Sequence, residues 1–462
     1  MNERGKQERE SLQATAVKAV IEDRYVMINW GTGVGKSRVA IEAADRLLHS
    51  GVQDILLLVD QGIHKTNWRN EFMEAKGEDY GAKLYDSLTV ECYASLPKYA
   101  GTKWDFIIAD EAHHLRSEGR TALLETLKAE RLLCLSATIS CKGDAEELLK
   151  TLSGFGTFRQ LDFGLQAAID HEILPEPTVH VHVLPLHNLS MRHVITEEWG
   201  PKVRRKTVTT DFAHYKEYVN KDLYPALTLN IESSVEEAYG YYEKQMKERS
   251  KAYKEMKTEA ETRGDVPAAR LEAAKNRMVR YGLLSKNLIG TAKTPFMGWL
   301  LGKISSKRYI CFCTDVDQAK ILGGDNVICN EVKNTDAVVD GFNRGERSNL
   351  FAVNMGKEGQ NLAGIEACVV IQLAGKDRHF IQEMGRAMRA KDPQQHIVVV
   401  DGTKDVEYLR ESLSSINPKY IRIHGYGDLA KKNIRLEDLS SPKDIETRER
   451  AARGAKIFSG LS

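Results

Sequence analysis

Short apolar runs that alternate with helix-compatible segments constrain the fold of this chain more than any other feature. The first group of runs occupies residues 25–30, 54–60, 105–110 and 131–136. Segments compatible with helices lie between them, at 37–49 and 119–130. Buried strands that alternate with helices are typical of a parallel α/β sheet, because each crossover helix covers one face of the sheet.

The pattern stops near residue 160 and resumes near residue 308. The second group of runs occupies residues 308–313, 326–329, 350–355, 368–373 and 396–401. We therefore expect an α/β fold with two parallel-sheet domains, at 1–160 and 301–430. Residues 431–462 are predicted to be a polar C-terminal tail.

Residues 161–300 are predicted to be an insertion with a β-hairpin and helices. Strand-like segments lie at 178–186, 191–196 and 203–210, and the Gly200-Pro201 pair between the last two is a turn signal. We expect these last two segments to pair as the hairpin. Helical spacing is found at 235–260 and 268–284.

Composition excludes several classes of protein. The 462 residues hold 66 Lys and Arg against 65 Asp and Glu, so a global cationic field is absent and any nucleic-acid binding must use local patches. No apolar run approaches the ~18 residues of a membrane span, and residues 1–10 carry no apolar signal segment. Seven scattered cysteines show no zinc spacing. We expect an intracellular, cytoplasmic or nucleoid-associated protein without membrane contact.

The segment GTGVGKS at 31–37 follows a predicted strand and precedes a predicted helix. Glycine lets backbone N–H groups converge on phosphate oxygens, and the N-terminus of the helix favours an anion. This predicts phosphate binding by the backbone of Thr32, Gly33, Val34 and Gly35, charge neutralisation by Lys36, and Mg²⁺ ligation by Ser37. The alternative is a glycine-rich loop with a chance lysine, and the bulky Trp30 stands where the pattern requires a small residue.

Asp110 and Glu111 directly follow the apolar run 105–109. Ligands bind at the carboxyl ends of parallel strands, where Asp110 can hold Mg²⁺ and Glu111 can orient or deprotonate a water. The alternative is a solvated pair that caps the next helix. A third pattern places Gln382, Arg386 and Arg389 on one face of a predicted helix. Such a face is either solvated and salt-bridged, or supplies arginine fingers to a phosphate site on the other domain.

Four segments, taken in their order along the chain, resemble the motif set of the superfamily 2 helicases and translocases. They are GTGVGKS at 31–37, DEAH at 110–113, SAT at 136–138 and QEMGRAMR at 382–389. The resemblance implies two RecA-like P-loop domains, with ATP and Mg²⁺ as cofactors. It implies that Gln13 reads adenine, that Ser136 and Thr138 couple nucleotide state to nucleic-acid contact, and that Gln382 approaches the γ-phosphate. Arg386 and Arg389 would be the arginine fingers.

Nucleic-acid contacts should be made mainly to phosphates. The candidates in the two motor domains are Lys65, Arg69, Arg116, Lys357 and Asn361. Those in the insertion are Trp199, Arg204 and Arg205, where Trp199 could stack on a base. Each could equally be an ordinary surface residue, and the hairpin could simply pack on its own scaffold.

The favoured function is an ATP-dependent DNA helicase or translocase that acts on forked or branched DNA in replication, recombination or repair. The two-motor core with its tryptophan-bearing segment at 61–72 resembles branch-migration and remodelling helicases more than RNA-processing ones, and it is similar to small phage-encoded recombination helicases. The alternatives are an RNA helicase, a nucleotide-gated clamp that does not unwind, and the motor subunit of a restriction system. We expect DNA as the partner, with replication or recombination proteins beside it, and activity as a monomer.

Overall fold

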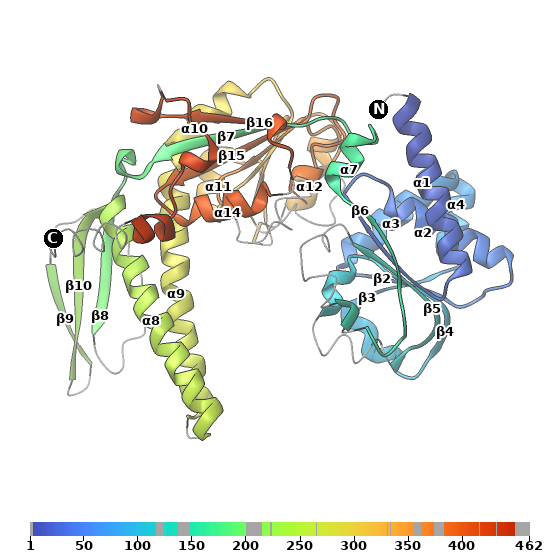
Figure 1. Cartoon of the computed structure of the whole chain (residues 1–462), viewed down its shortest axis with the longest axis horizontal. Coiled ribbons are helices and arrows are strands. Elements are labelled where there is room, and N and C mark those ends of the chain that lie inside the picture. Colours follow the sequence, from blue (N-terminus) through green and yellow to red (C-terminus); the bar gives the residue numbers. More distant parts are fainter. Residues whose placement is uncertain are drawn as a thin grey trace, which may run out of the picture.

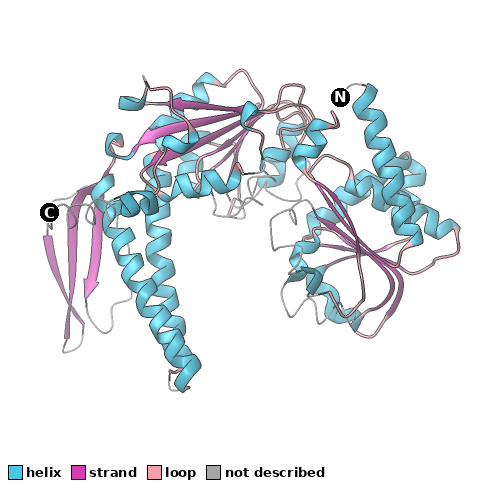
Figure 2. Cartoon of the chain, viewed as in Figure 1, coloured by secondary structure: helices cyan, strands magenta, loops and turns pink. Residues whose placement is uncertain are grey.

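The structure is a computed structural model of the whole chain. It describes residues 3–116, 124, 126–136, 148–150, 152–199, 215–221, 224–264, 266–329, 331–332, 334–353, 362–373, 383–414, 416–430 and 432–448. Two α/β domains lie side by side, and a long helical pair with a small sheet projects from the second domain (Figures 1 and 2). None of the described helices is long and apolar enough to cross a bilayer.

The first domain is built on a parallel sheet. Its described strands run in the order β3 (Thr89–Cys92), β2 (Ile55–Val59), β4 (Lys103–Ala109), β5 (Lys128–Ser136), β1 (Tyr25–Trp30) and β6 (Arg159–Phe163). Its described helices include α1 (Glu3–Glu22), α2 (Lys36–His49), α3 (Gly62–Lys76) and α4 (Glu78–Asp86), with 3₁₀ segments at Tyr93–Tyr99 and Ala112–Arg116. Strand β2 is buried at all five positions, as expected for a strand covered on both faces.

The second domain has a second parallel sheet. Its described strands run in the order β12 (Val327–Ile328), β13 (Asn349–Ala352), β11 (Tyr309–Phe312), β14 (Ala367–Val370), β15 (Gln394–Asp401), β7 (Thr178–Pro185) and β16 (Ile421–Gly425). Its described helices include α10 (Thr294–Lys303), α11 (Val316–Gly323), α12 (Thr335–Asn343) and α14 (Lys404–Ser412), with 3₁₀ segments at Pro418–Tyr420, Gly427–Leu429 and Leu436–Asp438. The prediction of two parallel α/β domains is confirmed.

The predicted insertion begins too early. Strand β7 lies inside the second sheet, where Val181 pairs with Ile397 of β15 and with Ile423 of β16. The alternating apolar residues of β7 fit a position inside the sheet. The sequence prediction placed this strand in the insertion because it precedes the other strands of the second domain along the chain. Short α7 (Leu165–Asp170) and the 3₁₀ segment Leu186–Asn188 flank β7. Part of the predicted tail also packs, because Leu439 is buried and Asp444 pairs with Arg410 of α14.

The insertion proper contains β8 (Arg192–Trp199), β9 (Tyr215–Lys221), β10 (Tyr224–Ser234), α8 (Val235–Arg263) and α9 (Ala268–Ala292). Both helices were predicted. Strand β8 pairs antiparallel with β10, and its predicted hairpin partner at 203–210 lies outside the described residues. Ser234 begins α8 with a capping box and Gly264 ends it in the left-handed conformation, so both boundaries have a local cause.

Another correction concerns 119–130, expected to be helical. Residues 124 and 126 are helical, but 128–130 begin strand β5, and residues 119–123 and 125 lie outside the described residues. Strands β3 and β6 escaped sequence reasoning because their four and five residues are only partly buried or exposed, and so carry little hydrophobic signal.

Four histidines form a stack across the second sheet. His180 and His182 on β7 lie beside His396 on β15 and His424 on β16, and the ring centroids of His180 and His396 are 4.7 Å apart. His182 shares hydrogen bonds with His396 at 3.0 Å and with the Tyr426 hydroxyl at 2.9 Å. Burial lowers the pKa of His180 to about 4 and that of His396 to about 3, so both rings are neutral near pH 7 and stack on one another. Among the described residues, no set of three or more metal-binding side chains is arranged around a cation site.

Candidate active site between the two domains

The glycine-rich loop connects β1 to α2, which begins at Lys36. Gly33 and Gly35 have φ values of 90° and 103°, a left-handed conformation that side chains disfavour. A Cβ on Gly35 would also lie 2.2 Å from the Gln13 Nε2 atom. Gln13 donates a hydrogen bond from this atom to the Val34 carbonyl oxygen at 3.0 Å. The predicted strand–loop–helix setting is therefore confirmed, and α1 braces the loop through Gln13.

Trp30 does not obstruct this loop. Its side chain is 1% exposed and packs in the core of the first domain. Its carbonyl oxygen accepts a hydrogen bond from Lys36 Nζ at 3.0 Å. The main chain of Trp30 thus holds the lysine across the mouth of the loop, while the indole points into the core.

The acidic pair lies at the carboxyl end of β4. Asp110 Oδ1 accepts a hydrogen bond from the Glu111 backbone N–H at 2.9 Å, and Oδ2 accepts one from Trp68 Nε1 at 2.8 Å. Glu111 has a φ of 46°, rare for a residue with a side chain and typical of strain held at functional positions. Its Oε2 atom lies 3.3 Å from His113 Nδ1.

Electrostatics around the pair favour a bound cation. Burial, with the neighbouring Glu111 carboxylate, raises the pKa of Asp110 to about 7, against the opposing effects of the Trp68 hydrogen bond and Lys36. Burial also lowers the pKa of Lys36 below its usual value, although the Glu111 and Asp110 carboxylates oppose this shift. A divalent cation beside Asp110 would hold it ionised at neutral pH.

Strand order brings the predicted residues together. In the sheet β5 lies between β4 and β1, so the carboxyl ends that bear Asp110, Ser136 and the phosphate loop are adjacent. Ser136 is the last residue of β5 and is fully buried. Its predicted companion Thr138 lies outside the described residues.

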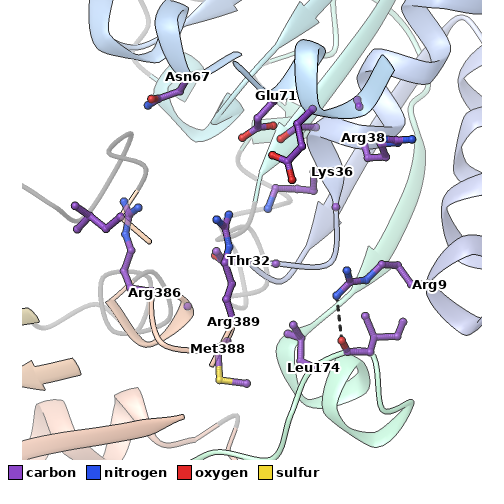
Figure 3. A pocket seen from close by; sticks show the side chains of 18 of the residues that line it. Arg9, Thr32, Lys36, Arg38, Asn67, Glu71, Leu174, Arg386, Met388 and Arg389 are labelled. Atoms are coloured by element: carbon purple, nitrogen blue, oxygen red, sulfur yellow. Dashed lines mark hydrogen bonds between the residues drawn. The ribbon is translucent and has the colours of Figure 1, made fainter. Parts of the chain in front are cut away.

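The second domain completes the site. A cavity of about 860 Å³ is lined by Lys36 and Ser37 of the first domain and by Arg386 and Arg389 of the second. Figure 3 shows Arg389 reaching from the second domain toward Lys36 and Glu71, with Arg386 beside it. The domains touch at Gly385, where an added Cβ would lie 2.7 Å from Thr32 Cβ.

The local structure around the arginines differs from the expected helix. Residues 383–385 are helical, and 386–389 form turns with i to i+3 hydrogen bonds, from Arg386 N to Glu383 O and from Ala387 N to Met384 O. Three residues per turn place Arg386 and Arg389 on one side, as the α-helical spacing also predicted. Gln382 lies outside the described residues.

One face of α3 lines the cavity, and sequence reasoning missed it. The lining includes Asn67, Trp68, Glu71 and Glu74, which follow the spacing of one helical face. Burial raises the pKa of Glu71, and the nearby Ser37 hydroxyl and Arg389 guanidinium oppose this shift. Arg9 of α1 also lines the cavity and donates to the Ile173 carbonyl oxygen at 3.1 Å. The only sequence signal for this face of α3 is the helical spacing of its polar residues at 67, 71 and 74.

Two of the candidate nucleic-acid-binding residues form ion pairs with other residues of this chain, and the side chains of the rest lie outside the described part of the structure. Lys65 pairs with Glu91 at 2.9 Å, and Arg69 pairs with Asp86. Arg116 ends a 3₁₀ segment and Trp199 ends β8, but only their backbones are described. The remaining candidates, Arg204, Arg205, Lys357 and Asn361, lie outside the described residues.

The residues present fit ATP and Mg²⁺. The loop N–H groups can donate hydrogen bonds to phosphate oxygens, and Lys36 can neutralise their charge. Gly33 and Gly35 have no side chains that would keep a phosphate away from the loop backbone. Ser37 and Asp110 offer the oxygen donors that Mg²⁺ prefers. When bound, Mg²⁺ would neutralise charge on the β- and γ-phosphates.

Two family models match the chain. The model described as "Type III restriction enzyme, res subunit" matches residues 6–141, and "Helicase conserved C-terminal domain" matches residues 299–391. These ranges contain the phosphate loop, the acidic pair and both arginines.

Two curated relatives are similar over most of this chain. A "DNA 3'-5' translocase XPB2" of Sulfurisphaera tokodaii is 24% identical over 423 residues, which are 86% of this chain and 83% of that protein. A "Putative DNA 3'-5' helicase Rad25" of Haloarcula marismortui is 24% identical over 395 residues. The aligned region covers 80% of this chain and 49% of that longer protein. The solved structure of S. cerevisiae Dbp5 bound to RNA and ADP BeF3 shares the fold, with a TM-score of 0.53, 11% identity, and coverage of 90% of this chain and 89% of that one.

Proposed function

We propose that the chain is a member of superfamily 2 of the helicases and translocases, to which its two matching family models and its curated relatives point. As such it is a DNA-stimulated ATPase that moves along DNA and remodels forked or branched duplexes. The observation that carries the proposal is the two-domain composition of the cavity. Lys36 and Ser37 come from one domain and Arg386 and Arg389 from the other.

Each residue has a defined part in this proposal. The loop N–H groups and Lys36 bind and orient the triphosphate. Glu111 orients the attacking water and accepts its proton on a carboxylate oxygen, while the bond between the γ-phosphorus and its bridging oxygen breaks. Arg386 and Arg389 stabilise the transition-state charge, an effect worth about 10³–10⁵ in rate for arginine fingers.

Motion follows from the same geometry. Since the arginines reach the phosphates only when Gly385 and Thr32 are in contact, ATP binds the closed cleft more tightly than the open one. This differential affinity is the energy that drives domain movement. Two surfaces that hold the nucleic-acid backbone, one on each domain, then move relative to each other.

The assay is steady-state ATP turnover with single-stranded, forked and four-way DNA, and with RNA. We expect stimulation by DNA, lost in Lys36→Ala. Stimulation by RNA alone would favour the RNA helicase, and turnover that ignores every nucleic acid would refute the motor function.

We further propose movement in the 3′ to 5′ direction, since the names of both curated relatives carry this polarity. Duplexes with a single 3′ or 5′ overhang test this directly. Unwinding that requires the 5′ overhang would contradict it.

A further inference from the structure

Three aromatic rings form a packed cluster on the surface of the second domain. Phe296 and Trp299 of α10 have ring centroids 5.4 Å apart. Tyr426, which follows β16, meets both rings edge-on, with centroids 4.6 Å from Phe296 and 5.6 Å from Trp299. In Figure 1, α10 lies at the upper edge of the second domain, away from the boundary with the first domain. None of the described residues that line the cavity between the domains belongs to α10, so the cluster is separate from that cavity.

Interactions beneath the surface hold the cluster in place. The Tyr426 hydroxyl shares a hydrogen bond with His182 Nδ1 at 2.9 Å. The Tyr426 backbone N–H donates to the Val183 carbonyl oxygen at 3.1 Å. On the other face of α10, Met297 and Leu300 are buried in the core of the second domain. The rings are therefore held in one arrangement before any ligand arrives, which lowers the entropic cost of binding.

Trp299 is the most exposed member of the cluster. It is 49% exposed, whereas Phe296 and Tyr426 are half-buried. A Cβ added at Gly298 or at Gly302 would meet no other part of the chain within 4 Å, so the space beside the indole is open. Single exposed hydrophobic side chains are common on protein surfaces. This one differs because two further rings hold it and a cation lies beside it.

Lys303 gives this surface a positive charge. Its Nζ atom lies 5.7 Å from the centroid of the Trp299 ring, near the ~6 Å limit of a cation–π contact, so it can turn to a phosphate with little loss. Lys303 is exposed and forms no ion pair within the described ranges. The acidic group next to Tyr426 in the chain, Asp428, accepts a hydrogen bond from the Asn188 amide at 3.3 Å. An aromatic face beside an ammonium matches the two parts of a nucleotide, a flat base and an anionic phosphate.

The apolar area here is too small for a stable protein interface. Such interfaces bury about 800 Å² on each partner and use about 20–30 residues a side. Trp299 is the one strongly exposed large hydrophobic side chain on α10. The others found among the described residues lie on other elements, and they are Tyr80, Val279, Leu283, Ile321 and Ile445. A base that stacks on one indole needs no larger apolar surface.

We propose that Trp299 and Lys303 form a stacking site for unpaired DNA bases on the outer surface of the second domain. A base lies on the exposed face of the indole, Lys303 contacts a neighbouring phosphate, and Phe296 and Tyr426 are positioning residues for the indole. The site accepts any sequence, because every base has a flat face. A separated strand held here is kept away from its complement. This inference rests on the proposed function, since it takes single-stranded DNA as the ligand.

Photo-crosslinking tests the site directly. Single-stranded DNA that contains iodouracil is bound to the full chain and irradiated, and mass spectrometry identifies the attached residue. Because the photoproduct forms with an aromatic ring stacked on the base, we expect a crosslink to Trp299 that is lost in Trp299→Ala. Crosslinks confined to other parts of the chain would overturn the stacking site.

Fluorescence anisotropy with a long single strand, in the absence of nucleotide, measures the contribution to affinity. We expect Trp299→Ala to weaken binding about 5- to 150-fold, as for the loss of one stacked base, and Trp299→Phe to retain most of the affinity. Lys303→Gln should reduce the slope of log affinity against log salt concentration by about 0.7. The matched control is Ile321→Ala on α11 of the same domain, which removes a side chain that is 74% exposed and should change neither quantity.

The outcomes separate the two proposals. Unchanged affinity in Trp299→Ala, with DNA-stimulated turnover intact, would overturn the stacking site and leave the motor function standing. The stacking site would also fall if only iodouracil RNA crosslinked, or if Trp299→Ala changed the oligomeric state in sedimentation without changing DNA binding. A protein that binds no single-stranded DNA, and whose turnover ignores every nucleic acid, would overturn both. Thermal melting of each variant checks the fold.

Discussion

Gly385→Ala should block the closed cleft with one methyl group. The added Cβ would lie 2.7 Å from Thr32 Cβ and 2.9 Å from Thr32 Cγ2. Carbon atoms are in optimal contact near 3.5–4.0 Å, so the approach is about 1 Å too close. Thr32 Cβ is attached directly to the loop backbone, and rotation of the side chain cannot remove it.

The second domain must therefore retreat by about 1 Å, or the phosphate loop must deform. A misplacement of about 1 Å in a catalytic arrangement can cost about 10²-fold in rate. We expect kcat for ATP turnover to fall by about this factor. Lys36 and Ser37 are untouched and should still bind nucleotide, but ATP affinity should fall because the closed cleft, which ATP binds more tightly, is no longer reached.

The assay is DNA-stimulated ATP turnover together with equilibrium nucleotide binding. The double variant Gly385→Ala with Thr32→Gly removes the opposing atoms and should recover most of the lost rate. Equal loss in the single and double variants, or no loss in Gly385→Ala, would refute the closed-cleft reasoning.

Three further predictions follow from other parts of the molecule. Arg386→Ala should retain ATP binding in a filter or fluorescence titration but lose hydrolysis by about 10³-fold or more; weakened binding with normal turnover would contradict the finger role. Lys293→Met leaves Asp405, 2.6 Å away in a buried ion pair, without its cation, and should destabilise the fold by about 3–5 kcal/mol in urea unfolding; added Asp405→Asn should restore part of it. Burial and neighbouring histidines lower the pKa of His182 to about 2 and of His396 to about 3. These rings stay neutral when folded but take up protons when unfolded below their ordinary value of about 6.5. Stability should therefore be full above that pH and fall by about 1.4 kcal/mol per pH unit for each ring below it. Melting temperatures that stay flat from pH 7 to 5 would contradict this.

Local chemistry made much of the site visible from the sequence. The phosphate loop needs glycine at 33 and 35 whatever surrounds it, since the backbone there has φ near 90–100°. The DEAH segment likewise follows a run that is buried wherever it folds. Such signals lie within a few neighbouring residues, so spacing along the chain is enough to find them.

Contacts between distant segments were not visible in the same way. Trp68 lies 42 residues from Asp110, and its indole looks like any core aromatic until the two elements pack. The buried strand β7 precedes β15 by more than 200 residues, and only sheet assembly assigns it to the second domain. Their positions depend on which surfaces meet, and the local sequence does not encode that.

The sequence by itself determined the two parallel-sheet domains and the chemistry of the phosphate loop, because burial periodicity and backbone conformation are local properties. Only the tertiary structure decided that the arginine turn abuts Thr32 at Gly385, that Trp68 of α3 donates to Asp110, and that Glu71 lines the same cavity as Ser37. These contacts arise when separate hydrophobic faces are buried together, so their partners are fixed by packing in three dimensions.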